Sequence, residues 1–203
     1  MLLAAIDSFA AFALVGVIAV WMRNSHYDVI GARLRGGAVP VAIVLTESGR
    51  WKALTALGAI AAVIFLALRA PLWIPIAILV SQITSQAVIE GVKRLFRRMR
   101  PGEWLVRVER GYSYPSGHSS TAVTFFCAWA LVVARSPIPN PGRDVLEALL
   151  VLWALGVAWS RLALGAHYVT DVIGGWLFGT GWLCLMIALA AHVKGPVLLP
   201  GLH

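Results

Sequence analysis

The sequence is short of charge. Aspartate, glutamate, lysine and arginine make up 13% of its 203 residues, against about 25% in an average soluble domain. The apolar set (AVILMFWYC) makes up 60%, and the mean hydropathy is +0.81. A chain of this size has too small an interior to bury that much apolar surface in water. This balance argues against a soluble enzyme, a disordered chain or a coiled coil, and it indicates a helical bundle in a membrane.

Cysteine and acidic residues are also scarce. The two cysteines, Cys127 and Cys184, lie inside apolar runs, which is typical of small core residues. They make neither a disulfide framework nor a metal-ligand spacing. The nine acidic residues offer no carboxylate cage of the kind that holds a hard cation. We therefore expect no metal and no other cofactor.

Long apolar segments dominate what remains, and a helix needs about 20 residues to cross a bilayer. Residues 38–46 are apolar but too short, so we expect them at the interface or as a re-entrant piece. The sequence predicts an all-α, polytopic membrane protein with a bundle of six transmembrane helices, forming a single domain over 1–203. The first span is expected to be retained, because no basic region precedes it. The expected spans are 2–22, 52–68, 72–92, 116–134, 145–159 and 169–192.

A basic segment follows the third expected span. Lys93 and Arg100 are seven residues apart, so they share one face if the helix continues that far. An arginine fork beside a lysine point charge suits a multiply charged phosphate. The alternative is an ordinary basic loop attracted to anionic lipid. In either case the net charge of +8 favours lipid headgroups or a phosphorylated substrate, and not nucleic acid, as the partner.

The fourth expected span opens with Pro115, Ser116, Gly117 and His118. Proline suits the first position of a helix, which would leave the N–H groups of Ser116 and Gly117 at a positive helix end that binds anions. Gly117 has no side chain to block the approach. His118 can exchange a proton near neutral pH. The alternative is a helix cap followed by an interfacial histidine.

A third cluster joins the last two expected spans and contains Arg161, His167 and Asp171. An aspartate four residues after a histidine can hold one imidazole nitrogen and leave the other as a lone pair, as in an activated nucleophile. A structural hydrogen bond is the alternative. Because successive spans alternate in direction, all three clusters are expected at one membrane face, where they form the active site.

The three clusters resemble the signature of the type-2 phosphatidic acid phosphatase superfamily, over about residues 40–192. The matching residues are Lys93, Arg100 and Pro101, then Pro115 to His118, then Ser160, Arg161, His167 and Asp171. The resemblance implies that His167 attacks phosphorus and becomes a phosphohistidine, while Asp171 orients it. It also implies that His118 protonates the leaving oxygen and then activates water. The implied phosphate-binding residues are Lys93, Arg100, Ser116, Gly117 and Arg161.

The resemblance further implies a metal-independent bacterial lipid phosphatase in the cytoplasmic membrane. Undecaprenyl diphosphate is the expected substrate, with phosphatidylglycerophosphate and phosphatidic acid as alternatives. Two other functions use the same site: a phosphotransferase that passes phosphate to a lipid acceptor, and a lipid-binding protein without turnover.

Two further expectations concern the membrane and partner chains. The resemblance implies an active site on the extracytoplasmic face of the membrane, where related bacterial enzymes place it, and this is the face we expect. However, thirteen of the 17 lysines and arginines lie on the site face, which favours the cytoplasm. Gly175 and Gly179 predict close helix packing, with a homodimer interface as one use of such a stripe.

Overall fold

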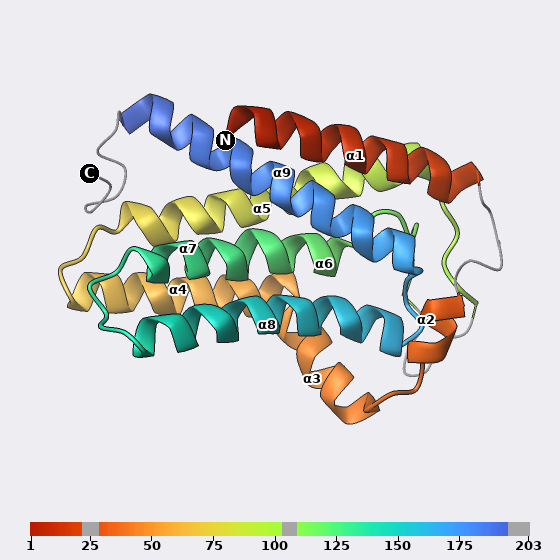
Figure 1. The fold of residues 1–203 in the computed structure, drawn as a ribbon, viewed down its shortest axis with the longest axis horizontal. Helices are drawn as coiled ribbons and strands as arrows, with labels where there is room; N and C mark the ends of the chain where they lie inside the picture. Colours follow the sequence, from red (N-terminus) through yellow and green to blue (C-terminus); the bar gives the residue numbers. More distant parts are fainter. Residues whose placement is uncertain (22–28, 103–108, 195–203) are drawn as a thin grey trace.

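In the computed structural model, residues 1–21, 29–102 and 109–194 are described, and all regular structure within these ranges is helical (Figure 1). The prediction of an all-α protein is confirmed. The helices are α1 (Leu2–Trp21), α2 (Val29–Leu34), α3 (Val39–Ser48), α4 (Trp51–Ala67), α5 (Trp73–Phe96), α6 (Gly117–Ala122), a π-helical segment (Val123–Cys127), α7 (Ala128–Ala134), α8 (Gly142–Ala163) and α9 (Val169–Lys194).

Five of these elements are long and apolar enough to cross a membrane: α1, α5, the continuous run from α6 to α7, α8 and α9. The sixth candidate is a pair, α3 and α4, joined at a bend of 60°. The stretch 38–46 thus lies largely in α3, the first arm of a pair that is either a broken span or a re-entrant loop. The re-entrant piece that the sequence predicts is one of these two forms. The predicted end of the first span, Met22, lies outside the described residues.

The bend between α3 and α4 follows from close packing against α8. Gly49 lies at the corner, and a Cβ atom placed there would come within 2.6 Å of Val157 Cγ1. A side chain at position 49 would therefore push α8 away. This corner brings Gly49 and the following residues of α4 to the end of the bundle that holds the site.

Two spans are longer than the sequence predicts. Helix α5 continues four residues past Val92 to Phe96, and α8 extends from Gly142 to Ala163 where 145–159 is predicted. Periodicity marks only the apolar part of a helix, whereas these extensions carry charged side chains. They place Lys93 in the last turn of α5 and Arg161 in the last turn of α8.

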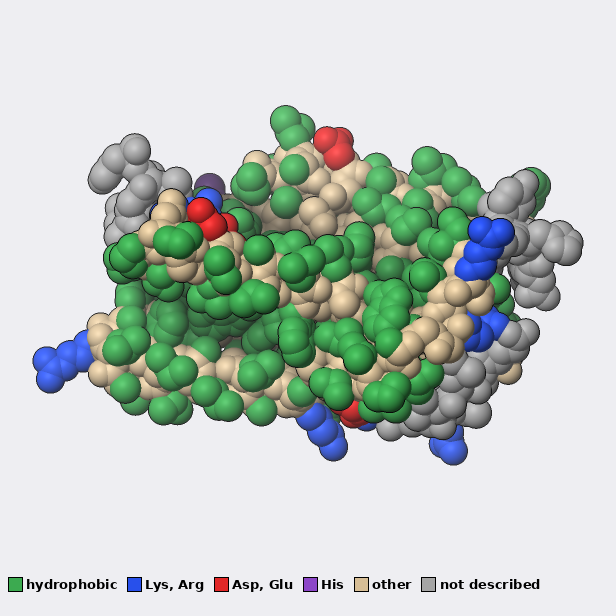
Figure 2. Space-filling model, turned by 60° about the horizontal axis from the view of Figure 1, so that its bottom comes forward, with side chains coloured by type: hydrophobic (Ala, Val, Ile, Leu, Met, Phe, Trp, Pro, Cys, Tyr) green, Lys and Arg blue, Asp and Glu red, His purple; other side chains and the backbone are tan. Residues whose placement is uncertain are grey.

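The surface of the bundle is apolar. Leu14, Val63 and Leu152 are 62%, 65% and 60% exposed. Figure 2 shows hydrophobic side chains over the middle of the visible face, with lysine and arginine projecting at its margins. Lipid tails, unlike water, accommodate such a surface. The chain is therefore an integral membrane protein with several spans.

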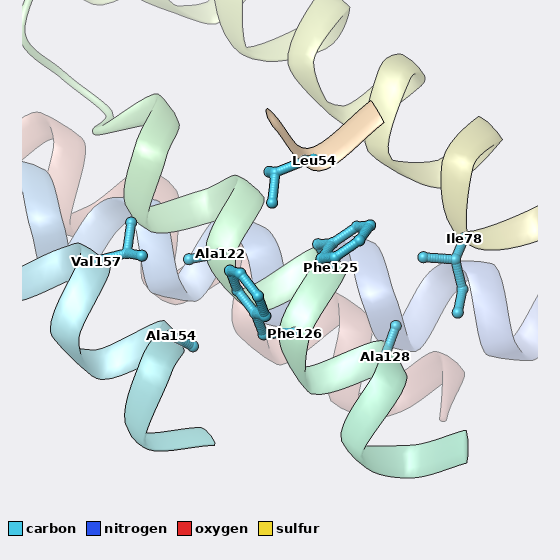
Figure 3. Close-up of a cluster of buried hydrophobic side chains, with 8 residues drawn as sticks. All are labelled: Leu54, Ile78, Ala122, Phe125, Phe126, Ala128, Ala154 and Val157. Carbon is cyan, nitrogen blue, oxygen red and sulfur yellow. The ribbon is translucent and has the colours of Figure 1, made fainter. Parts of the chain in front are cut away.

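The centre of the bundle is held by a cluster of buried side chains from α4, α5, the α6–α7 run and α8 (Figure 3). Its members are Leu54, Ile78, Ala122, Phe125, Phe126, Ala128, Ala154 and Val157. Beside it, the Thr124 hydroxyl donates a 3.0 Å hydrogen bond to Gln82 Oε1. Gln82 thus links α5 to the fourth span across the membrane interior, where such bonds hold helices together.

The small-residue stripe on α9 is used within the chain. A Cβ atom at Gly175 would meet the Ser116 carbonyl oxygen at 2.5 Å, and one at Gly179 would meet the Ser120 carbonyl oxygen at 2.8 Å. The predicted close packing is therefore found, between α9 and α6. Because α6 already covers this face, it offers no surface to a second copy of the chain.

Candidate active site

The ends of four helices meet at one end of the bundle, on the right of Figure 1. They are the C-terminal ends of α5 and α8 and the N-terminal ends of α6 and α9. A cavity of about 470 Å³ opens there, large enough for the headgroup of a lipid. Five of the eight predicted site residues line it: Lys93, Arg100, Gly117, His118 and His167. The other three, Ser116, Arg161 and Asp171, are buried behind the cavity wall.

Lys93 and Arg100 reach the cavity by a route that differs from the predicted continuous helix. Helix α5 ends at Phe96, and Arg97 adopts a left-handed conformation with φ of 48°. The chain then leaves helical structure and is held to the segment before α6, because the Ser113 N–H donates a 2.8 Å hydrogen bond to the Arg98 carbonyl. Lys93 and Arg100 therefore both line the cavity. They do not share a helical face, because α5 ends between them.

His167 lies between Arg100 and Asp171, and its contact with Arg100 indicates which ring nitrogen carries the proton. Arg100 Nη1 is 3.0 Å from His167 Nε2, and an arginine can only donate. Nε2 must therefore carry the lone pair and Nδ1 the proton. Nδ1 lies 3.4 Å from Asp171 Oδ2. The pair is close as predicted, although His167 precedes α9, which begins at Val169.

Burial, with the charges of Arg100 and Arg161, holds the pKa of the His167 imidazole well below its ordinary value. The ring is therefore neutral at physiological pH, as a nucleophile requires.

Ser116 has a different role from the one its position predicts. It is the N-cap of α6, and its hydroxyl accepts hydrogen bonds from the Ser119 N–H at 3.4 Å and the Ser119 hydroxyl at 2.8 Å. The Ser116 N–H donates to the Asp171 carbonyl at 2.9 Å, so it is not available to an anion. Pro115 consequently lies before the cap and not at the first helical position. Gly117 alone of this pair lines the cavity, with room for a Cβ atom 3.6 Å from Lys93 Nζ.

His118 lines the same cavity as His167. Its Nε2 atom is buried and has no hydrogen-bond partner within the described part of the chain. An imidazole beside a polar cavity with an unpartnered ring nitrogen is suited to receive or donate a proton during a reaction.

Arg161 is 1% exposed and is held by an acid that the sequence analysis missed. Its Nη2 lies 2.5 Å from Glu109 Oε1, and its Nη1 donates to the Thr46 hydroxyl. Glu109 Oε2 also lies 3.4 Å from Arg100 Nη1. One carboxylate thus bridges the two arginines that are predicted to bind phosphate. Burial opposes its ionisation, but the positive charges of Arg161 and Arg100 hold the pKa of the Glu109 carboxyl below its ordinary value.

Lys93 also has an acidic partner. Its Nζ lies 2.7 Å from Glu90 Oε1, and Gln86 Nε2 donates to the same oxygen at 3.3 Å. The sequence shows Gln86, Glu90 and Lys93 at helical spacing, so this contact could have been inferred. Glu109 and Thr46 carried no comparable signal, because they lie far from their partners along the chain.

Comparisons with known proteins place the chain in a family. The sequence model of the PAP2 superfamily matches residues 71–193. Phosphatidylglycerophosphatase B of Escherichia coli K12 is 34% identical over 92 residues, which are 45% of this chain and 34% of that protein. A lipid A 1-phosphatase of Rhizobium etli is 38% identical over 77 residues, which are 38% of this chain and 28% of that protein. The chain thus spans about a third of the length of these relatives.

The fold is similar to that of a solved structure. The crystal structure of a transmembrane PAP2 type phosphatidylglycerolphosphate phosphatase from Bacillus subtilis matches with a TM-score of 0.80 and 21% sequence identity. The match covers 94% of this chain and 98% of that one. It shows that the two chains share the arrangement of their helices.

Proposed function

The chain belongs to the PAP2 superfamily, and from this premise we propose that it is a lipid phosphatase that works through a phosphohistidine at His167. The observation that carries the proposal is the state of the His167 ring. Its Nε2 lone pair lies at a cavity lined by cations, and its Nδ1 proton lies toward Asp171. A protein that only bound lipid phosphate would have no need of a neutral, oriented nucleophile.

The proposed reaction has two steps. In the first, His167 Nε2 forms a bond to phosphorus, the bond from phosphorus to the lipid oxygen breaks, and His118, which starts the cycle protonated, gives that oxygen its proton. In the second, water gives a proton to His118 and attacks phosphorus, the N–P bond breaks, and inorganic phosphate leaves. Both histidines return to their starting states, and splitting the hydrolysis lowers each barrier.

The phosphoryl oxygens carry negative charge through both steps, and fixed cations stabilise it. The contacts at the cavity wall come from Lys93, Arg100 and the Gly117 N–H. Arg161 adds a third positive charge when the phosphate replaces Glu109 as its partner. Ser116 contributes by capping α6 and so fixing the position of Gly117 and His118. No metal is required for this charge stabilisation.

We propose phosphatidylglycerophosphate as the substrate. The Escherichia coli relative and the Bacillus subtilis structure are both named for this lipid, which favours it over undecaprenyl diphosphate. The cavity supports a lipid with two phosphates. Among the described residues that line it are three more cations, Arg50, Lys52 and Arg110. Lys52 and Arg110 would bind a second phosphate while Lys93 and Arg100 bind the reacting one, and Arg50 would join them by leaving its 2.9 Å ion pair with Glu47.

The test is phosphate release by the purified protein in detergent, with EDTA present and no acceptor lipid. Three substrates are compared: phosphatidylglycerophosphate, undecaprenyl diphosphate and phosphatidic acid. We expect release from all three, with the highest kcat/KM on phosphatidylglycerophosphate and a value at least about tenfold lower on phosphatidic acid, a difference of about 1.4 kcal/mol. Preference for phosphatidic acid would contradict the two-phosphate argument. Turnover that appears only when an acceptor lipid is added would identify a phosphotransferase.

Glu109 gives a second prediction, because its carboxylate occupies the two arginines that phosphate needs. In a Glu109→Gln variant, the inhibition constant of inorganic phosphate should fall about fivefold, a change of about 1 kcal/mol. The reason is that the carboxylate no longer competes with phosphate for a charge-assisted contact with the arginines. Inhibition constants measured against wild type provide the comparison. Glu147→Gln is the matched control, since Glu147 lies near Arg143 at the opposite end of the bundle. Weaker inhibition in the Glu109 variant would show that the carboxylate holds the arginines in their binding positions.

A further inference from the structure

Arg98 lies two residues before Arg100, but it does not line the cavity. Its side chain is 10% exposed and reaches the first turn of α9. There its Nη1 lies 2.6 Å from Asp171 Oδ1 and donates a 2.6 Å hydrogen bond to the Thr170 hydroxyl. Its guanidinium carbon lies 4.2 Å from the centre of the Tyr168 ring. One side chain therefore contacts three residues of the segment that follows His167.

The backbone of Arg98 is fixed as well. Its carbonyl accepts hydrogen bonds from the Ser113 N–H at 2.8 Å and from the Ser113 hydroxyl at 3.3 Å. Arg98 thus joins the end of α5 to the chain that enters α6 and to the start of α9. The guanidinium has little freedom to leave Asp171.

The two carboxylate oxygens of Asp171 face different partners. Oδ1 faces Arg98, whereas Oδ2 accepts the Tyr168 N–H at 2.9 Å and lies 3.4 Å from His167 Nδ1. The carboxylate is 0% exposed, and a carboxylate removed from water stays ionised only where a cation and hydrogen bonds compensate its charge. The short pair with Arg98 provides that charge on the side away from His167.

We infer that Arg98 is a positioning residue for the nucleophile and acts through Asp171. It sets the plane of the Asp171 carboxylate and keeps it charged, so that Oδ2 stays beside His167 Nδ1, 3.4 Å away, and Nε2 stays directed at the cavity. This inference rests on the proposed phosphatase function. It assigns Arg98 a role separate from that of its neighbour Arg100, which meets the phosphate itself.

The first test is the effect of Arg98→Met on phosphatidylglycerophosphate hydrolysis. Methionine keeps an unbranched apolar stem beside Tyr168 but removes the charge. We expect kcat to fall by about 10–100-fold, as for other outer partners of a reacting group. KM should change by less than about twofold, because no phosphate contact is lost. Arg98→Lys restores a point charge without the planar fork and should recover part of the loss in kcat.

The decisive measurement repeats Arg98→Met in an Asp171→Asn protein, with residual turnover followed by radioactive phosphate release. If Arg98 acts through the Asp171 carboxylate, the Asp171→Asn protein has no carboxylate for Arg98 to orient. Removing Arg98 from that protein should then lower kcat by less than about threefold. A purely structural tether between α5 and α9 would be lost equally in both backgrounds. Equal losses would therefore overturn the inference, as would a kcat within twofold of wild type for Arg98→Met.

Two controls separate the possible failures. Arg94→Met removes an exposed cation from the same basic segment and should leave kcat and KM unchanged, which excludes a general effect of net charge. If Arg98→Met elutes as an aggregate from a sizing column in detergent, Arg98→Lys replaces it in both backgrounds under the same criteria. Absence of phosphate release by wild type would reject the proposed phosphatase itself, a result distinct from every outcome of the Arg98 series.

Discussion

A His167→Ala variant is expected to lose phosphate release by at least about 10⁴-fold while remaining folded. Alanine removes the atom that forms the bond to phosphorus, and neither His118 nor a cation can replace it from its own position. The imidazole contacts Arg100 and Asp171 but does not belong to the apolar cluster at the centre of the bundle. Stability in detergent should therefore change little.

The measurement is initial phosphate release under EDTA, together with labelling by a radioactive substrate and rapid acid-free quenching to detect phosphohistidine. The matched control is His192→Ala, because His192 is exposed near the far end of α9. The control should keep full turnover and full labelling. A labelled His167→Ala protein would place the covalent intermediate on another residue and reject the proposed nucleophile.

The convergence of the three motifs was predictable from the sequence because it depends on direction alone. Apolar segments of crossing length alternate in direction, so the end of the third and fifth spans and the start of the fourth and sixth must lie together. The structure confirms this for Lys93, Gly117, His118 and His167. The family that the motifs resemble is confirmed by the match over residues 71–193.

Features that depend on contacts between distant residues could not be predicted. The end of α5 at Phe96 follows from a left-handed Arg97, and arginine gives no signal for that conformation, unlike glycine. The Ser116 N–H is occupied by the carbonyl of Asp171, 55 positions further along the chain. Helix periodicity carries no information about such a pair, so the predicted anion site at Ser116 was wrong in this respect.

The missed residues share one physical role. Each of three site cations is paired with an acid: Lys93 with Glu90, Arg98 with Asp171 and Arg161 with Glu109. Cations gathered in a partly dehydrated cavity would otherwise repel one another strongly. In the proposed mechanism two of these pairs are exchangeable, because the substrate phosphate takes the place of Glu90 or Glu109. The third pair, Arg98 with Asp171, lies behind the proposed nucleophile, His167, and is not exchangeable. We therefore expect removal of Arg98 to lower kcat, and removal of the Glu109 carboxylate to change the affinity for phosphate.

The second large effect is expected at His118, and it should depend on the leaving group. A His118→Ala variant should lose about 10²–10⁴-fold in kcat on phosphatidylglycerophosphate, because the departing lipid oxygen then lacks a proton donor. With p-nitrophenyl phosphate the first step should lose much less, because a nitrophenolate leaves without being protonated. The second step still lacks a base for the attacking water, so phosphohistidine should accumulate.

This prediction gives a signature that a general loss of structure cannot imitate. The His118→Ala protein should release one equivalent of p-nitrophenol in a rapid burst, hold one equivalent of acid-labile phosphate, and then turn over slowly. The double variant with His167→Ala should show neither burst nor label, which ties the trapped phosphate to His167. If His118→Ala instead loses the same factor on both substrates and shows no burst, His118 transfers no proton. Its unpartnered Nε2 would then serve to bind a phosphoryl oxygen.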